Sequence, residues 1–210
     1  MNRIMRTVLI ALFSLAATAV FAQEDFSADI VNHKSDGNSN TAKIYVTRDK
    51  MRFESQERSG HSGVVIINLV TQTSDILMSE QKMYMEFANG QGPGAQRTWN
   101  LFRARDNDNA CSDWLKLPYN QGGTCSKVGS ETVNGRSTIK YQGTNAKGET
   151  SYVWLDPKIA FPIKWQGANG AGGELQNIQA GAQPSSLFEI PVGFRKMELP
   201  AGMPNMQRPQ

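Results

Sequence analysis

Histidine and cysteine, the side chains that most often carry catalysis or bind metals, are scarce in this sequence. Two histidines and two cysteines occur among 210 residues. Neither His33 nor His61 belongs to a catalytic motif, because the patterns G-x-S-x-G and H-E-x-x-H are both absent. The sequence therefore predicts a protein that is not an enzyme and that uses neither a metal nor a cofactor.

A strong excess of charge of one sign is also absent. Lys and Arg total 22, against 19 Asp and Glu. Arg3 and Arg6 precede the N-terminal apolar run. Without them the chain has 20 basic residues and 19 acidic residues, which gives a net charge of about +1. A nearly neutral chain lacks the basic surface that nucleic-acid binders use, so no nucleic-acid partner is expected.

Long apolar runs are missing after residue 23, so no segment there is expected to span a membrane. The one long run, residues 7–21, follows two arginines and leads to small residues, Val20 and Ala22, at the positions that signal peptidase reads. This pattern predicts a removed signal peptide over residues 1–22. A membrane anchor is the alternative, but the run is shorter than the roughly 20 residues of a helical span.

The only cysteines are Cys111 and Cys125. Neither stands near the predicted cleavage point, so the mature chain is expected to be soluble and to carry no lipid anchor. In an exported chain the simplest expectation is a disulfide between them. In the chain-entropy model, a disulfide that closes the loop between these two cysteines stabilises the folded protein by about 3 kcal/mol. A metal-binding or redox pair is the alternative, although no C-x-x-C motif occurs.

Alternation of apolar and polar residues dominates the chain from residue 26 onwards. Phe26, Ala28 and Ile30 share one phase, and similar runs recur as far as residue 87. Asn134 and Gly135 separate two alternating runs and predict a tight hairpin, because both residues tolerate positive φ. Further strands are expected at residues 150–156, 161–166, 174–179 and 187–191.

Residues 88–125 follow a different pattern. A glycine-rich stretch at 88–96 precedes two segments with helical spacing of apolar residues, 97–105 and 111–117. We therefore predict an α+β fold. It consists of a strongly curved antiparallel sheet of about nine to eleven strands, with a short helical insertion laid across one face.

One face of the predicted sheet is rich in methionine, an unbranched side chain that adapts to irregular partners. The face is either a dry core, filled by the tryptophans and phenylalanine of the helical insertion, or the wall of a ligand cavity. The pattern alone leaves both possibilities open. The candidate lining residues are Ile44, Val46, Met51, Phe53, Ile76, Met78, Met83, Met85 and Phe87 of the strands, with Trp99 and Phe102 of the helical insertion.

Glu54 and Glu86 fall on the opposite, polar phase of these strands. Two carboxylates can serve glycoside hydrolysis, and with His61 they are the only candidates for a hydrolase that acts on envelope polymers. Solvated carboxylates are ordinary on the outer face of alternating strands. A hydrolase is therefore the weakest of the alternatives.

Five strings follow one another along the chain: "AKIYVTRDKMRFES", "KMYMEF", "VNGRSTIKYQ", "WLDPKIAFPIKW" and "LFEIPVGFRKMELP". Together they resemble a family of small secreted bacterial proteins of unassigned role, related to the LolA and LolB lipoprotein carriers. The resemblance covers most of residues 26–200. It implies an incomplete half-barrel with a helical lid, whose apolar concave face can hold acyl chains.

On this resemblance, residues 23–200 are expected to form a single LolA-like domain, followed by a flexible proline-rich tail over 201–210. The expected function is that of a soluble periplasmic protein that holds a lipid or lipoprotein acyl chain in the half-barrel cavity. The eleven apolar residues named above are its predicted lining. The alternative is a non-catalytic module of the cell envelope that has a dry core and binds a protein partner.

Overall fold

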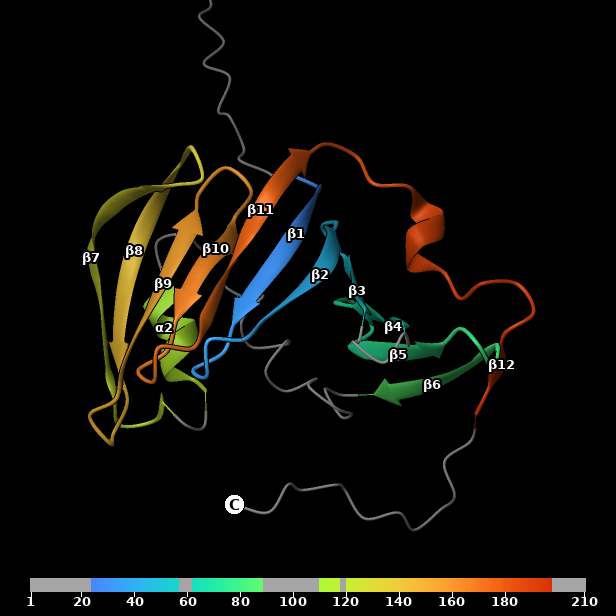
Figure 1. The fold of residues 1–210 in the computed structure, drawn as a ribbon, viewed down its shortest axis with the longest axis horizontal. Coiled ribbons are helices and arrows are strands. Elements are labelled where there is room, and N and C mark those ends of the chain that lie inside the picture. The colour runs from blue at the N-terminus through green and yellow to red at the C-terminus, as the bar shows by residue number, and fades with distance from the viewer. Residues whose placement is uncertain (1–23, 57–61, 89–109, 118–119, 198–210) are drawn as a thin grey trace, which may run out of the picture.

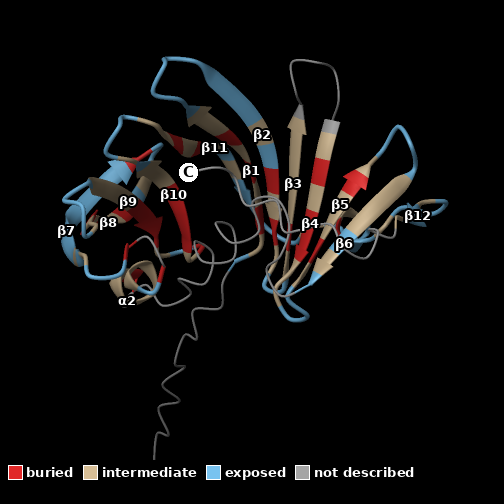
Figure 2. Ribbon diagram, turned by 90° about the horizontal axis from the view of Figure 1, so that it is seen from below, coloured by how far each residue is buried: buried red, intermediate tan, exposed pale blue. Residues whose placement is uncertain are grey.

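The computed structural model describes residues 24–56, 62–88, 110–117 and 120–197, and most of these residues belong to one large sheet. Twelve strands join in the order β12-β6-β5-β4-β3-β2-β1-β11-β10-β9-β8-β7. The sheet curves into an open arch (Figures 1 and 2). The strands are β1 (Phe26–His33), β2 (Ser39–Val46), β3 (Lys50–Gln56), β4 (Ser62–Asn68), β5 (Thr73–Met78), β6 (Met83–Ala88), β7 (Thr124–Val133), β8 (Arg136–Thr144), β9 (Thr150–Asp156), β10 (Phe161–Gln166), β11 (Gly172–Ala180) and β12 (Arg195–Lys196).

The curved antiparallel sheet expected from the sequence is confirmed, with two differences. It has twelve strands rather than nine to eleven, and β12 pairs with β6 in parallel. Helix is limited, among the described residues, to α2 (Ala110–Leu115), the 3-10 turn η2 (Ser185–Phe188) and the single 3-10 residue Asn120. The fold is therefore almost entirely β rather than α+β. None of the helices described is both long and apolar enough to cross a membrane.

The first strand lies in the middle of the sheet. β1 pairs with β2 on one side and with β11 on the other, so that Ile30 stands opposite both Ala42 and Leu175. This pairing joins a meander of β1 to β6 to a second meander of β7 to β11. Hairpin turns that tolerate positive φ hold each meander in register, as at Asn134 and Gly135 between β7 and β8.

The main core lies on the concave face, where the two meanders meet. Phe26, Ile44 and Val46 from the first meander pack with Phe161 and Leu175 from the second, and all five are buried. The rings of Phe26 and Phe161 meet edge to face, with 5.1 Å between their centroids. Each such side chain contributes about 1.5–3 kcal/mol when fully buried. This cluster therefore fixes the two halves of the arch together.

A second cluster covers the convex face. Val64, Ile66 and Leu77 point to this side and pack against Phe188 of η2. Arg52 reinforces the contact by donating a hydrogen bond from Nη1 to the carbonyl of Leu187, at 2.9 Å. The prediction of a strand at residues 187–191 is therefore wrong. The apolar residues of this segment pack against the convex face of the sheet, and the segment does not form a strand of the sheet.

Asp75 is an unusual polar residue on this convex face. It stands directly opposite Glu86 in the β5–β6 pair, and its Oδ1 atom is buried without a hydrogen-bond partner in the described structure. Burial, and secondly the negative charge of Glu86, raise the pKa of Asp75, while Lys196 acts in the opposite direction. The ionised form of Asp75 is thus disfavoured in the folded protein.

Asp75→Asn is expected to increase the free energy of unfolding at pH 7. The pKa of Asp75 is higher in the folded chain than in the unfolded one, so its contribution to stability is present at low pH and is lost as pH rises through the folded-state pKa. Asparagine does not titrate, so the pH dependence should also flatten. Urea denaturation at about pH 4 and pH 7 measures both effects. The exposed Asp49→Asn is the control, and an unchanged or lower stability of Asp75→Asn at pH 7 would contradict the argument.

The helix α2 is attached to the edge of the sheet. A disulfide joins Cys111 of α2 to Cys125 of β7, as the sequence predicts. The helix expected over 111–117 is also confirmed, although it spans Ala110–Leu115. The remaining predictions lie outside the described residues: the signal peptide over 1–22, His61, the helix over 97–105 with Trp99 and Phe102, and the tail over 201–210.

Candidate functional site

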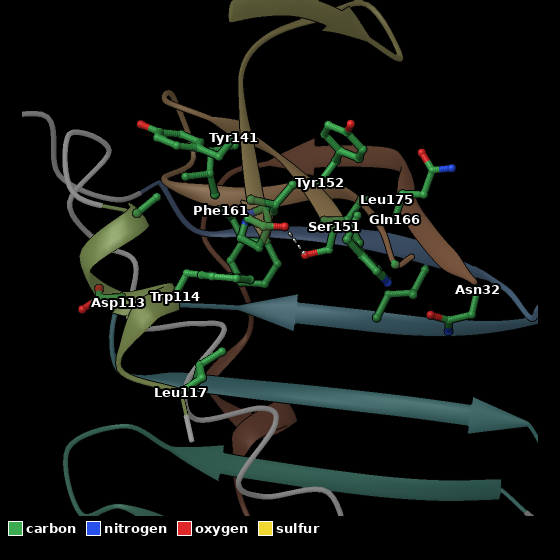
Figure 3. Close-up of a pocket in the computed structure, with 18 of the residues that line it drawn as sticks. Asn32, Asp113, Trp114, Leu117, Tyr141, Ser151, Tyr152, Phe161, Gln166 and Leu175 are labelled. Carbon is green, nitrogen blue, oxygen red and sulfur yellow. Dashed lines mark hydrogen bonds between the residues drawn. The ribbon is translucent and has the colours of Figure 1, made fainter. Parts of the chain in front are cut away.

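A cavity of about 600 Å³ lies on the concave face, between the sheet and α2 (Figure 3). Ligand pockets in proteins typically have about 300–1,000 Å³. Both meanders contribute to its wall, and α2 closes one side. The lining residues are Ile30, Asn32, Asn40, Ala42, Ile44, Phe53, Ser55, Ala110, Asp113, Trp114, Leu117, Cys125, Tyr141, Gly143, Ser151, Tyr152, Val153, Leu155, Phe161, Pro162, Trp165, Gln166, Gly167 and Leu175.

Two tryptophans form walls of this cavity because each lies flat on a glycine. A Cβ atom added at Gly143 would lie 2.4 Å from the ring of Trp114, and one added at Gly173 would lie 2.5 Å from the ring of Trp165. Any larger residue at these two positions would push the rings inward. The lack of a side chain at Gly143 and Gly173 thus lets both indoles pack directly against the sheet.

Gly143→Ala is expected to displace Trp114 and lower the free energy of unfolding by about 1–3 kcal/mol, the usual effect of overpacking. Urea denaturation followed by tryptophan fluorescence measures the loss. Gly63→Ala is the matched control, since the added Cβ would meet only the Ser55 hydroxyl, at 3.1 Å. Equal stability of the two variants would show that Trp114 does not rest on Gly143.

The cavity is apolar inside and polar at one end. Ile44, Leu155 and Leu175 are buried in its wall. The polar residues lie where β1, β3 and β10 end and where β2 and β9 begin, so the topology brings them to a single rim of the sheet. Figure 3 shows Asn32 at the end opposite the helix residues Asp113 and Leu117. The polar rim residues are Asn32, Asn40, Ser55, Ser151 and Gln166, of which Gln166 directs its side chain to the opposite face of the sheet, as its pairing with Tyr152 indicates.

Charge is nearly absent from the cavity wall. Asp113 is the one charged residue in the described lining, and its carboxylate accepts a hydrogen bond from Lys116 Nζ at 2.9 Å. No lysine or arginine lines the described cavity. Within the described ranges, no three His, Cys, Asp or Glu side chains gather where they could hold a metal ion. The described part of the site offers an apolar surface and hydrogen-bonding groups, and it presents no cationic side chain to an anionic ligand.

The two carboxylates considered for hydrolysis lie on the convex face, away from this cavity. Glu54 pairs with Arg52 at 2.6 Å, and Glu86 pairs with Lys196 at 2.8 Å. β4 and β5 separate their strands. At about 4.8 Å per strand their backbones lie roughly 14 Å apart, beyond the ~5–10 Å between the carboxyl groups of glycosidases. The structure does not assemble them into a pair.

The predicted lining residues of the strands share the concave face, as the register of β2 to β6 shows. Ile44 and Phe53 line the cavity. Val46 and Met51 are buried in the core beside it. The remaining five are half-buried on the same face and do not touch the cavity, so their part in ligand binding stays a prediction: Ile76, Met78, Met83, Met85 and Phe87.

Sequence reasoning missed the half of the cavity that the second meander provides. The alternation of β9 separates Val153 and Leu155 from Tyr152 and Trp154 but does not show which pair faces inward. The pairing of Val153 with Tyr141 and of Leu155 with Ile139 places the aliphatic pair beside α2. The alternating pattern of β9 showed that two pairs of side chains lie on opposite faces of the strand. It did not show which pair faces the cavity, because that depends on the pairing with β8.

Trp154 points to the other side of β9. Its indole donates a hydrogen bond to Glu131 at 2.6 Å, and Lys140 and Lys164 each lie within 5 Å of its ring centroid. Hydrogen bonds from Lys140 and from Trp154 hold the pKa of Glu131 below its usual range. The largest aromatic side chain of β9 is therefore satisfied outside the cavity.

Comparisons with known proteins establish the fold. No protein-family model matches the chain, and no curated protein matches it. An uncharacterised conserved protein from Thermus thermophilus has 9% identity and a TM-score of 0.54, covering 84% of this chain and 91% of that one. The structure of PNGF-II matches with 11% identity and a TM-score of 0.47 over 85% of this chain, which spans only 31% of that protein.

A LolA superfamily protein from Nitrosomonas europaea is also similar, with 9% identity, a TM-score of 0.35, and coverage of 80% of this chain and 90% of that one. A putative outer membrane lipoprotein-sorting protein domain from Vibrio parahaemolyticus is similar too, with 11% identity and a TM-score of 0.33. The similarity to the Thermus protein demonstrates a shared fold.

Proposed function

We propose that this protein is a soluble periplasmic binding protein that holds the acyl chain of a lipid or lipoprotein in the cavity between the sheet and α2. The observation that carries the proposal is an apolar cavity of about 600 Å³ that Trp114 and Trp165 border but do not fill. The disulfide and the resemblance to exported carriers support a periplasmic location.

The energetics of burial are sufficient for such a ligand. Each methylene moved from water into an apolar site gives about 0.8 kcal/mol. A chain of about a dozen methylenes would give on the order of 10 kcal/mol before the costs of ordering and association are subtracted. No catalytic group and no cofactor are needed for this binding, because the apolar wall supplies the free energy.

The test has two parts. Mature protein purified from cells is extracted with organic solvent, and the extract is analysed for lipid by mass spectrometry. The delipidated protein is then titrated with monolauroylglycerol while tryptophan fluorescence is recorded, since Trp114 and Trp165 line the cavity and should respond. A lipid-free extract together with an unchanged fluorescence spectrum would remove the proposal.

A further inference from the structure

We infer that the ligand of this cavity carries an uncharged, hydrogen-bonding head group, such as an ester, an amide or a glycerol hydroxyl, and not an ionised carboxylate or phosphate. The inference rests on the proposed acyl-chain function and specifies its ligand. It follows from three features of the wall: the position of the polar groups, their hydrogen-bonding state, and the distribution of charge.

The polar groups stand where a head group would emerge. Asn32 of β1 and Asn40 of β2 face each other as a cross-strand pair at the rim. Trp165 of β10 lies in the same row, because its backbone pairs with Gly173 across from Asn32. A chain that fills the apolar interior near α2 therefore ends at the two amide side chains of Asn32 and Asn40, and Figure 3 shows Asn32 at this end.

These amides are available to a ligand. The side chains of Asn32 and Asn40 make no hydrogen bond to any other described residue. Each amide side chain offers both donors and an acceptor, so it pairs equally well with carbonyl and hydroxyl groups. The rim is therefore chemically matched to a neutral group that both donates and accepts hydrogen bonds.

An ionised head group finds no such match. No lysine or arginine lines the described cavity, and the one charged residue is the carboxylate of Asp113. A carboxylate or phosphate drawn toward the rim would lose part of its hydration without gaining an opposite charge. A cationic head group gains little either, because Asp113 lies at the opposite end and is already paired with Lys116.

The test compares lauroyl ligands that share one chain and differ in their head. At roughly pH 8, where laurate is ionised, monolauroylglycerol should bind delipidated protein at least about tenfold more tightly than laurate, as measured by tryptophan fluorescence titration or calorimetry. The affinity for laurate should rise as pH falls toward the carboxyl pKa. A short uncharged peptide with an N-terminal lauroyl amide is a third ligand. Its rank against monolauroylglycerol separates an acylated protein from a free lipid as the source.

Charge variants at the rim test the assignment of the head-group end. Asn40→Lys should raise the affinity for laurate at least about fivefold relative to monolauroylglycerol, since it places a cation beside the head group. Thr41→Lys is the matched control, because it adds the same charge at the next position of β2, on the opposite face. It should leave the ratio unchanged.

The possible results are separable. Laurate binding as tightly as monolauroylglycerol to the unaltered protein overturns the inference and leaves acyl-chain binding intact. Equal effects of the two lysine variants overturn the placement of the head group at this rim. Failure of every lauroyl ligand to bind removes the proposed function itself.

Discussion

Ala42→Trp is expected to abolish acyl-ligand binding while the protein still folds. Ala42 lies in β2 between two other wall residues of the same phase, Asn40 and Ile44, and it projects from the concave face into the cavity. An indole at this position would occupy the space that a ligand chain needs, and the open cavity gives it room without forcing the core apart. The affinity for monolauroylglycerol should fall at least about tenfold.

Thr41→Trp is the matched control for this change. Thr41 is the adjacent position of β2, is exposed, and points to the opposite face of the sheet. The variant adds the same ring and should bind the ligand as the unaltered protein does. Urea denaturation of both variants separates a blocked cavity from a damaged fold. If Ala42→Trp binds with unchanged affinity, the cavity beneath α2 is not the binding site.

Loss of the disulfide should have the largest effect on stability. Cys111→Ser combined with Cys125→Ser removes the covalent link between α2 and β7 and is expected to lower the free energy of unfolding by about 3 kcal/mol. α2 has only six residues, too few for a helix to be stable alone in water. Its position over the cavity therefore depends on this link, and ligand affinity should fall together with stability.

The neighbouring double variant Ser112→Ala with Ser126→Ala is the control, since it alters the same two elements and keeps the disulfide. Chemical reduction of the unaltered protein should reproduce the effect of the cysteine substitutions. Denaturation midpoints in urea compare all three proteins. A double cysteine-to-serine variant as stable as the unaltered protein would mean that packing alone positions α2.

Local pattern was enough to predict the sheet. Residues such as Phe26, Ala28 and Ile30 alternate so regularly that both the strands and their inward faces could be read from the chain. The strand expected at residues 187–191 failed for a physical reason. Leu187, Phe188 and Ile190 are apolar because they pack against the convex face, and apolarity over so short a run does not distinguish a strand from a docked segment.

The cavity itself could be predicted only in part. Ile44 and Phe53 were found because they follow the inward phase of the first meander. Their partners across the cavity, such as Leu155 and Leu175, come from strands more than a hundred residues later in the chain. Only the β1–β11 pairing and the curvature of the sheet bring them together. Neither feature leaves a periodic signal in a single sequence.

The central position of β1 has a consequence for how the protein acquires its binding site. β1 begins at Phe26, but its partner β11 ends at Ala180, so the contact that unites the two meanders is among the most distant in the chain. Pairings of such long sequence separation form slowly, because a large loop must close first. A polypeptide synthesised from its N-terminus can fold the early hairpins, but the wall of the cavity is incomplete until β11, which carries Leu175, has emerged. The cavity is thus among the last features of the fold to form.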